Sequence, residues 1–126
     1  MHIQLEAHDK HTIRSYTDQQ VTIDEIEYTQ SIVVSKEALH SNWAVHALNE
    51  LNETTLEPLL TSEPEIILIG HQHLNVPTPI GILQYLSQRR VGIECMSIGA
   101  ACRTFNVLLG EHRKVVIGII LPSKDA

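Results

Sequence analysis

The amino-acid sequence predicts an α/β fold formed by a single domain, residues 1–126. Strand-like patterns fill the N-terminal third, whereas residues 66–96 have the pattern of a strand, a helix and a second strand. Residues 91–121 repeat that order, with small residues where the second helix begins. Because a strand–helix–strand crossover places its two strands parallel in one sheet, the second half of the chain predicts parallel strands with right-handed connections.

Composition favours a folded protein that does not enter a membrane. Apolar residues make up 43% of the chain, which is enough for a hydrophobic core. The formal net charge of −6 disfavours binding to nucleic acid or to an anionic membrane surface. No apolar run approaches the roughly 20 residues of a membrane span, and the first residues do not resemble a signal peptide. Two cysteines cannot form a disulfide framework, so we expect a soluble protein of a reducing compartment.

The N-terminal third is expected to form short strands. Ile3, Leu5 and Ala7 alternate with polar residues, which is the period of a half-buried strand. Further β-prone runs lie at residues 12–16, 21–23 and 26–34, with turns between them at residues 17–20 and 24–25. The apolar end of the last run, residues 32–34, predicts burial on both faces.

The middle of the chain predicts a short helix followed by a buried strand. Thr54 and Glu57 match a capping box with Thr54 as the N-cap, so a helix is expected at residues 55–61. Residues 65–70, which contain the continuous apolar run 66–69, predict a strand that is buried on both faces and ends in Gly70.

A second helix is expected to start at Thr78 and Pro79. Thr78 is the predicted N-cap, and proline suits the first helical position. One face of this helix carries three apolar residues, Ile80, Leu83 and Leu86. Arg89 and Arg90 fall in its last turn, where positive charge complements the helix dipole.

The C-terminal third predicts a strand, a third helix and a final strand. The expected bounds are 91–96 for the strand, 99–109 for the helix and 115–121 for the final strand. Cys102, Phe105 and Leu109 share the inner face of the helix, and Gly110 suits the left-handed position after its end. Residues 111–114 are expected to form an exposed turn.

The carboxyl ends of the parallel strands are the predicted place for a ligand, as in other open α/β sheets. The predicted ligand-binding residues at this edge are Gly70, His71, Glu94, Gly99, Arg103 and Asn106. The helix start at Gly99 offers free N–H groups to an anion, and Arg103 adds positive charge within one turn.

Each of these residues also has a structural interpretation. Glu94, which is unusual in an apolar strand, acts either as a general acid or base with a raised pKa or as the partner of an arginine or a helix N-terminus. The small residues that begin at Gly99 allow close packing of the helix on the sheet, which needs no ligand. Asn106 either binds a ligand or caps a neighbouring loop.

Metal and redox chemistry are not expected. His71 and His73 could hold a metal ion, but a metal site needs three or four ligands and no Cys or Asp cluster adjoins them. We therefore expect exposed loop histidines, no metal and no cofactor. Cys95 and Cys102 are expected to be buried and inert, and Trp43 is either a core residue or an interface anchor. No Ser–His–acid pattern is present, so no catalytic residue is assigned.

The segment Val-Gly-Ile-Glu-Cys-Met at residues 91–96, followed by Ala-Ala-Cys-Arg-Thr-Phe-Asn-Val-Leu at residues 100–108, resembles a family of small domains of largely unassigned function. The family includes the mitochondrial factor that assists assembly of respiratory complex I and an animal protein associated with adipogenesis. Residues 28–34, the Trp43 region and residues 64–70 are similar too, so the resemblance covers nearly the whole chain.

The resemblance implies a three-layer α/β fold with a central mixed β-sheet, helices on one side and a β-hairpin layer on the other. It implies no catalytic residue. Relatives tend to have Gly-Thr-Gly where this chain has Gly70-His71-Gln72, and Asp-Thr where it has Ser97-Ile98. Ser97 is therefore expected to act as a substitute N-cap.

Two functions from different classes follow. The first, which rests on the resemblance and on the lack of a catalytic pattern, is a non-enzymatic protein-interaction or assembly-factor-like domain. This protein would be cytoplasmic and bacterial, with another protein or a second copy of the chain as partner. This function predicts an exposed apolar patch near Trp43 or the strand edges. The second is a small-molecule or anion-binding domain, enzymatic or not, whose site at the carboxyl ends of the strands forms a concave polar pocket. Neither function involves nucleic acid or an integral membrane segment.

Overall fold

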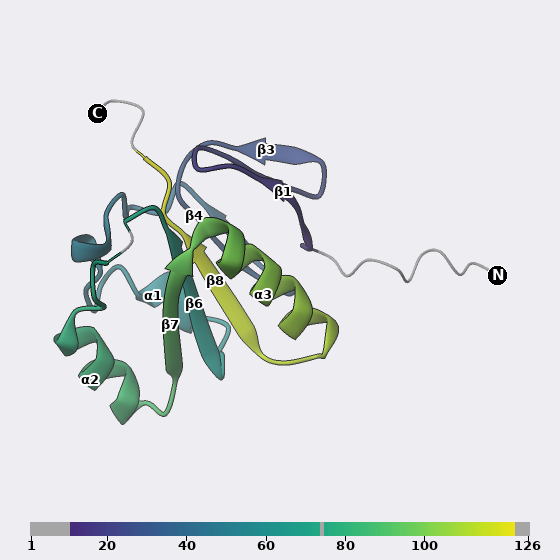
Figure 1. Cartoon of the computed structure of the whole chain (residues 1–126). Helices are drawn as coiled ribbons and strands as arrows, with labels where there is room; N and C mark the ends of the chain where they lie inside the picture. The colour runs from purple at the N-terminus through teal and green to yellow at the C-terminus, as the bar shows by residue number, and fades with distance from the viewer. Residues whose placement is uncertain (1–10, 74, 123–126) are drawn as a thin grey trace.

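The computed structural model describes residues 11–73 and 75–122, and the strand predicted around residues 3–7 lies outside them. This part of the chain contains two sheets (Figure 1). The smaller sheet is antiparallel and contains β1 (Ile13–Tyr16), β2 (Val21–Ile23) and β3 (Ile26–Tyr28). The larger sheet has five strands in the order β5-β4-β8-β6-β7.

The strands of the larger sheet are β4 (Ile32–Ser35), β5 (Leu39–Ser41), β6 (Ile66–His71), β7 (Gly92–Ser97) and β8 (Val115–Ile119). Strand β4 is antiparallel to β5 and β8, whereas β6 is parallel to β7 and β8. The helices are α1 (Glu57–Leu60), α2 (Ile80–Gln88) and α3 (Ile98–Gly110), with a short 3-10 helix, η2, at Leu48–Glu50. The sheet is therefore mixed, and β8 joins its antiparallel half to its parallel half.

Each face of the larger sheet has its own hydrophobic core. One core, which includes Ile23 and Phe105, joins the larger sheet to α3 and the small sheet. The other, which includes Trp43, Leu59 and Leu86, joins it to α1, α2 and the loop around Trp43. The predicted α/β class, central mixed sheet and separate hairpin layer are confirmed. Helix α3 shares its face with the hairpin layer (Figure 1), while α1 and α2 cover the opposite face.

The hairpin turns follow the local sequence. Asp24 and Glu25 close the β2–β3 hairpin with φ values of 51° and 68°. Two successive left-handed residues form the turn whose twist matches that of the flanking strands, and Asp is among the residues that tolerate this conformation. The Thr17 N–H donates to the Gln20 carbonyl at 2.8 Å in the preceding turn. Both predicted turns are confirmed.

The apolar runs occupy the inner strands, as predicted. Every residue of β4 and β8 is buried. Trp43 lies in the core beside them, only 2% exposed, with its indole N–H donating to the Thr55 carbonyl at 2.9 Å. A Cβ on Gly118 of β8 would lie 2.7 Å from the Trp43 ring, so the absence of a side chain there admits the indole.

The predicted capping box at Thr54 and Glu57 is wrong. The reciprocal bonds join Asn52 and Thr55 instead, with the Asn52 N–H donating to the Thr55 hydroxyl at 2.8 Å and the Thr55 N–H donating to the Asn52 side-chain oxygen at 2.9 Å. The same three-residue spacing fits both pairs, and Asn is as good a cap as Thr. Helix α1 accordingly begins at Glu57.

The start and the apolar face of α2 also differ from the prediction. Thr78 does not cap the helix, because its hydroxyl contacts the Cys95 sulfur at 3.1 Å. The buried residues are Ile82 and Leu86. Ile80 is 72% exposed and Leu83 is 43% exposed. The helix has two apolar stripes, and the sheet accepts the one with the four-residue spacing.

Two helix ends were placed differently from the prediction. Helix α2 ends at Gln88, so Arg89 and Arg90 follow it rather than forming its last turn. The Arg89 guanidinium lies 3.8 Å from the centre of the Tyr85 ring. After α3, the left-handed residue is His112, with φ 64°, and not Gly110, which is the last residue of the helix.

Candidate functional site

The carboxyl ends of β6 and β7 lie side by side at one edge of the larger sheet, as predicted. In the parallel register Gly70 pairs with Met96 and His71 pairs with Ser97. Helix α3 begins directly after β7, and the Ser97 hydroxyl accepts a hydrogen bond from the Ala100 N–H at 3.2 Å. The predicted N-cap role of Ser97 is confirmed.

The two glycines of the predicted site lie where other groups approach closely. A Cβ on Gly70 would be 3.0 Å from the Ala101 Cβ and 3.2 Å from the Ile98 Cα. A Cβ on Gly99 would be 2.9 Å from a ring carbon of Tyr16. The small residues therefore allow α3 to pack tightly on β6 and on the small sheet, which matches their structural interpretation.

Arg103 and Asn106 both bind strand β1. The Arg103 guanidinium donates to the Tyr16 hydroxyl at 2.6 Å. The Asn106 side chain accepts from the Ile13 N–H and donates to the Ile13 carbonyl, each at 2.9 Å. The Asn106 amide thus forms with Ile13 the two hydrogen bonds that the main chain of a neighbouring strand would form. These bonds fix the small sheet to α3.

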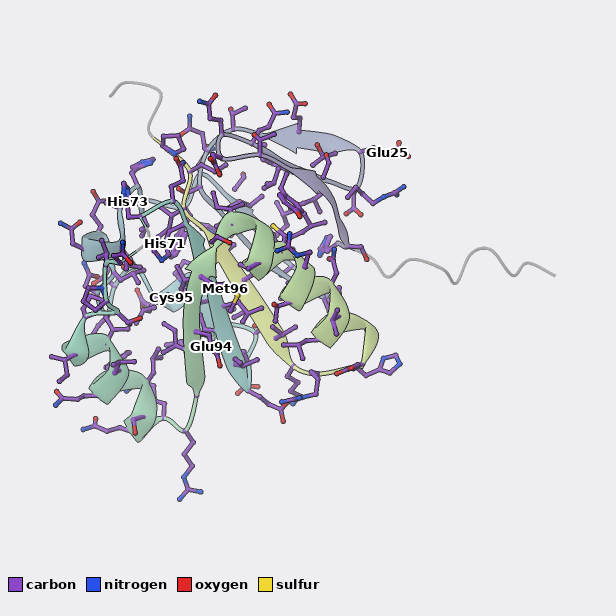
Figure 2. The ribbon with its side chains drawn as sticks, in the orientation of Figure 1. Glu25, His71, His73, Glu94, Cys95 and Met96 are labelled. Carbon is purple, nitrogen blue, oxygen red and sulfur yellow. The ribbon has the colours of Figure 1, made fainter. Side chains whose placement is uncertain are left out.

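Glu94 is exposed on β7, opposite Leu68 of β6. Figure 2 shows Glu94, Cys95 and Met96 in succession along β7, with Glu94 farther from His71 than the other two. Within residues 11–73 and 75–122, the Glu94 carboxylate forms neither an ion pair nor a hydrogen bond. The structure therefore does not join its carboxylate to the Arg103 guanidinium.

His71 is buried, which contradicts the expectation of an exposed loop histidine; His73 is exposed. The His71 Nδ1 accepts a hydrogen bond from the His73 N–H at 3.1 Å. Burial, and to a lesser extent the charge of His73, lowers the pKa of His71. The described residues contain no group of three or more His, Cys, Asp or Glu side chains that could hold a metal ion.

The two cysteines are free thiols in apolar surroundings. Cys102 is buried, and burial raises its pKa to about 12. Cys95 is partly buried, and burial raises its pKa as well, with a smaller contribution from Glu94. Both thiols therefore stay protonated near neutral pH, and a protonated thiol is a poor nucleophile.

A cavity that we did not predict from the sequence lies at the other end of the larger sheet, where β6 and β8 begin. It has a volume of about 710 Å³ and is lined by the β4–β5 turn, the end of α1 and the loop between α3 and β8. Five basic or imidazole side chains line it, namely Lys36, His40, His112, Arg113 and Lys114. Three of them are consecutive, and this basic run in an acidic chain was the available signal.

The fold defines the class of this protein, a small mixed α/β domain with a second, three-stranded sheet packed beside a helix. The chain belongs to the family described as "Protein of unknown function (DUF498/DUF598)", whose model matches residues 13–120. The predicted resemblance to a family of largely unassigned function is thereby confirmed.

Two curated relatives carry different names. The "13 kDa major membrane protein" of Francisella tularensis is 27% identical over 95 residues, which cover 75% of this chain and 77% of that protein. The "NADH dehydrogenase [ubiquinone] 1 alpha subcomplex assembly factor 3" of Drosophila melanogaster is 29% identical over 85 residues, or 64% of this chain. The match spans only 43% of the fly protein.

Solved structures share the fold over most of their length. A Xanthomonas campestris protein solved by NMR is 28% identical, with a TM-score of 0.78, and the match covers 86% of this chain and 83% of that one. A Bartonella henselae protein described as an outer membrane protein is 24% identical, with a TM-score of 0.76, over 90% of this chain and 97% of its own. In the described part of the present chain, no helix combines the length and the apolar composition needed to cross a membrane.

Proposed function

We propose that the protein is a protein-interaction domain that acts in the assembly of a larger protein complex. The fly relative named as an assembly factor supports this role. The observation that carries the proposal is an apolar surface on the outer side of α2 and the loop before it. We name this the α2 surface and define it by Val76, Ile80 and Leu83.

The α2 surface has the character of a contact site for another protein. Val76 is 44% exposed, and Ile80 and Leu83 are exposed on successive turns of the same helix face. Strand β7, against which α2 packs, is an edge strand with β6 as its one neighbour in the sheet. Exposed apolar side chains on a helix beside an edge strand are typical of protein contact sites.

The partner that this surface fits is a protein with an apolar face flanked by acidic side chains. Arg89 lies just beyond α2, where its stacking on Tyr85 holds the guanidinium in place. Arg90 follows it and forms no ion pair within the described residues. An acidic rim on the partner would therefore meet two positive charges at the end of the helix.

The test compares two double variants in affinity capture from the native host. Ile80→Ser with Leu83→Ser removes the apolar character of the α2 surface, whereas Ile26→Ser with Val107→Ser changes two exposed apolar residues elsewhere. We expect the wild type and the control variant to retain one defined partner at a fixed ratio, and the α2 variant to lose it. Equal capture by all three proteins would rule out this surface.

A second copy of the chain is the alternative occupant of the α2 surface. Light scattering on the wild type and the α2 double variant distinguishes the two cases. A monomer at all concentrations leaves a different protein as the partner. A dimer that dissociates in the α2 variant would instead make this surface a homodimer interface and contradict the assembly role proposed for it.

A cytoplasmic location in a bacterial cell is part of the proposal. The relative named a major membrane protein makes attachment to a membrane the competing expectation. Fractionation of host cells with a high-salt and a carbonate wash separates the two. Recovery in the unwashed soluble fraction supports the proposal, and recovery with membranes after both washes contradicts it.

A further inference from the structure

The cavity at the amino ends of β6 and β8 combines an apolar floor with a basic rim. Its floor includes Val33 and Val116, which are buried and belong to the same hydrophobic core on one face of the larger sheet. Pro58 in the first turn of α1 and Pro64 after the end of this helix line it as well. These side chains offer no hydrogen-bonding group, so the floor suits an aliphatic or aromatic moiety.

The rim of the cavity carries three positively charged side chains. Lys36, Arg113 and Lys114 are three of the nine Lys and Arg residues of the chain, and all three line this one cavity. Glu37 is the one acidic residue among those that line it in the described part of the chain. An excess of positive charge at one cavity is unexpected in a protein with a net charge of −6 and indicates an anionic ligand.

Two of these cations are available to a ligand. The Arg113 guanidinium is engaged by the Glu65 carboxylate at 3.3 Å, and this hydrogen bond is the largest cause of the lowered pKa of Glu65. The ammonium groups of Lys36 and Lys114 form no ion pair within residues 11–73 and 75–122, and the charge of Lys114 makes only the smallest contribution to the lowered pKa of Glu65. They come from separate loops, so a ligand held between them would contact both sides of the cavity.

The loops that present these lysines are held by main-chain hydrogen bonds. The Ser35 N–H donates to the Ala38 carbonyl at 2.9 Å, which closes the turn that contains Lys36. The Lys114 carbonyl accepts from the Glu65 N–H at 2.8 Å. Binding therefore requires ordering of the lysine side chains but little rearrangement of the backbone.

We propose that this cavity binds a small amphiphilic anion, in which an apolar chain or ring lies on the valine floor and a carboxylate or phosphate lies between Lys36 and Lys114. The volume of about 710 Å³ is within the range of small-molecule sites. The site lies at the end of the larger sheet opposite to the carboxyl ends of β6 and β7. It is also separate from the α2 surface, so this proposal and the proposed function can fail independently.

The first test uses isothermal titration calorimetry with four probes below their critical micelle concentrations. Decyl phosphate and sodium decanoate have both the chain and the anion, inorganic phosphate has only the anion, and decyltrimethylammonium has only the chain. We expect saturable binding of the first two with one ligand per chain, and weak or no binding of the others. Equal binding of the anionic and cationic decyl probes would overturn the proposal, because it would reflect hydrophobic contact alone.

The second test locates the binding with matched variants. Lys36→Glu with Lys114→Glu reverses the charge of the rim, and Arg89→Glu with Arg90→Glu makes the same net change at the end of α2. We expect the rim variant to bind decyl phosphate about tenfold or more weakly and the control to bind as the wild type does. A similar loss in both variants would show that the overall charge, and not this cavity, attracts the anion.

A third variant blocks the cavity without changing its charge. Ala38 lines the cavity and is exposed, whereas Ala44 is exposed outside its lining. We expect Ala38→Trp to abolish binding and Ala44→Trp to leave it unchanged, with thermal unfolding confirming that both fold. Unchanged binding by Ala38→Trp, or NMR shift changes in the wild type that fall outside the residues lining the cavity, would contradict the proposal.

Discussion

Gly118 shows how one missing side chain supports the core. The Trp43 ring lies against the position where a Cβ of residue 118 would stand, at 2.7 Å and 2.8 Å from two ring carbons. Neither the buried indole nor the central strand can move without disturbing its neighbours. The approach joins residues 75 positions apart, so no local pattern indicates it.

We predict that Gly118→Ala lowers the free energy of unfolding by about 1–3 kcal/mol, the usual cost of overpacking a core. Gly110→Ala is the control, since a Cβ there would meet nothing within 4 Å. Alanine favours a helix over glycine, so the control is expected to be neutral or slightly stabilising. Urea unfolding measures both, and an unchanged Gly118→Ala variant would show that the indole can shift at little cost.

His71 predicts a pH dependence of stability. Its pKa is lowered from the ordinary value of 6.5 by burial, so the unfolded chain binds a proton more readily than the folded protein does. Acidification therefore favours unfolding. The stability conferred by neutral His71 is complete above about pH 6.5 and is lost as the pH falls through its lowered folded value.

Urea unfolding between pH 8 and pH 5 measures this effect. We expect His71→Gln to lose less stability over that interval than the wild type. His112→Gln, a change of an exposed histidine, is expected to follow the wild type. Parallel curves for His71→Gln and the wild type would show that other groups account for the pH dependence.

At the scale of elements, the order of the helices, the inner face of α3 and most strands were predictable from the sequence, whereas β5 and the inner face of α2 were not. The runs at residues 32–34 and 66–69 are short, apolar at every position and rich in β-branched residues, which indicates buried strands. Helix α2 has two apolar stripes, and the choice between them depends on the sheet it meets. Residues such as Ile80 cannot be assigned to the inner or outer face from spacing alone.

The candidate site shows the same limit. The position of the ends of β6 and β7 beside the start of α3 was correctly predicted from the sequence, because a strand–helix–strand crossover fixes that geometry. The bond between Asn106 and Ile13 joins residues 93 positions apart, and the cavity at the other end is built from three separate loops. Such contacts depend on the packing of distant segments, which local periodicity does not encode.

The attachment of β1 to α3 depends on Asn106. We predict that Asn106→Ala destabilises the protein by about 1–3 kcal/mol, because the Ile13 N–H and carbonyl both lose their partner. Asn106→Asp keeps the acceptor and loses the donor, so it should retain part of the stability near neutral pH. Chemical denaturation with NMR detection measures both, and a neutral Asn106→Ala change would show that water replaces the amide.

At the scale of the whole molecule, β8 is the strand on which both halves depend. It pairs with β4 on one side and β6 on the other, and every one of its residues is buried. Strands β5 and β7 lie at the edges of the sheet. Opening the sheet at an edge breaks one set of hydrogen bonds, whereas opening it at β8 breaks two.

Hydrogen exchange should reveal this hierarchy. We expect the slowest-exchanging amides in β8 and β6, with exchange only by global unfolding, and faster exchange in β5 and β7. Native-state exchange at increasing denaturant, followed by NMR, measures the opening free energy of each strand. Opening of β8 at a lower free energy than β7 would contradict a sheet held together at its centre.

The position of β8 also determines when this protein can fold during its synthesis. On the ribosome, the segments that become β4, β5, β6 and β7 emerge before β8 does. The two halves of the larger sheet are then separate and prone to aggregation, because no strand joins them. We therefore expect the larger sheet to form only after β8 has emerged from the ribosome.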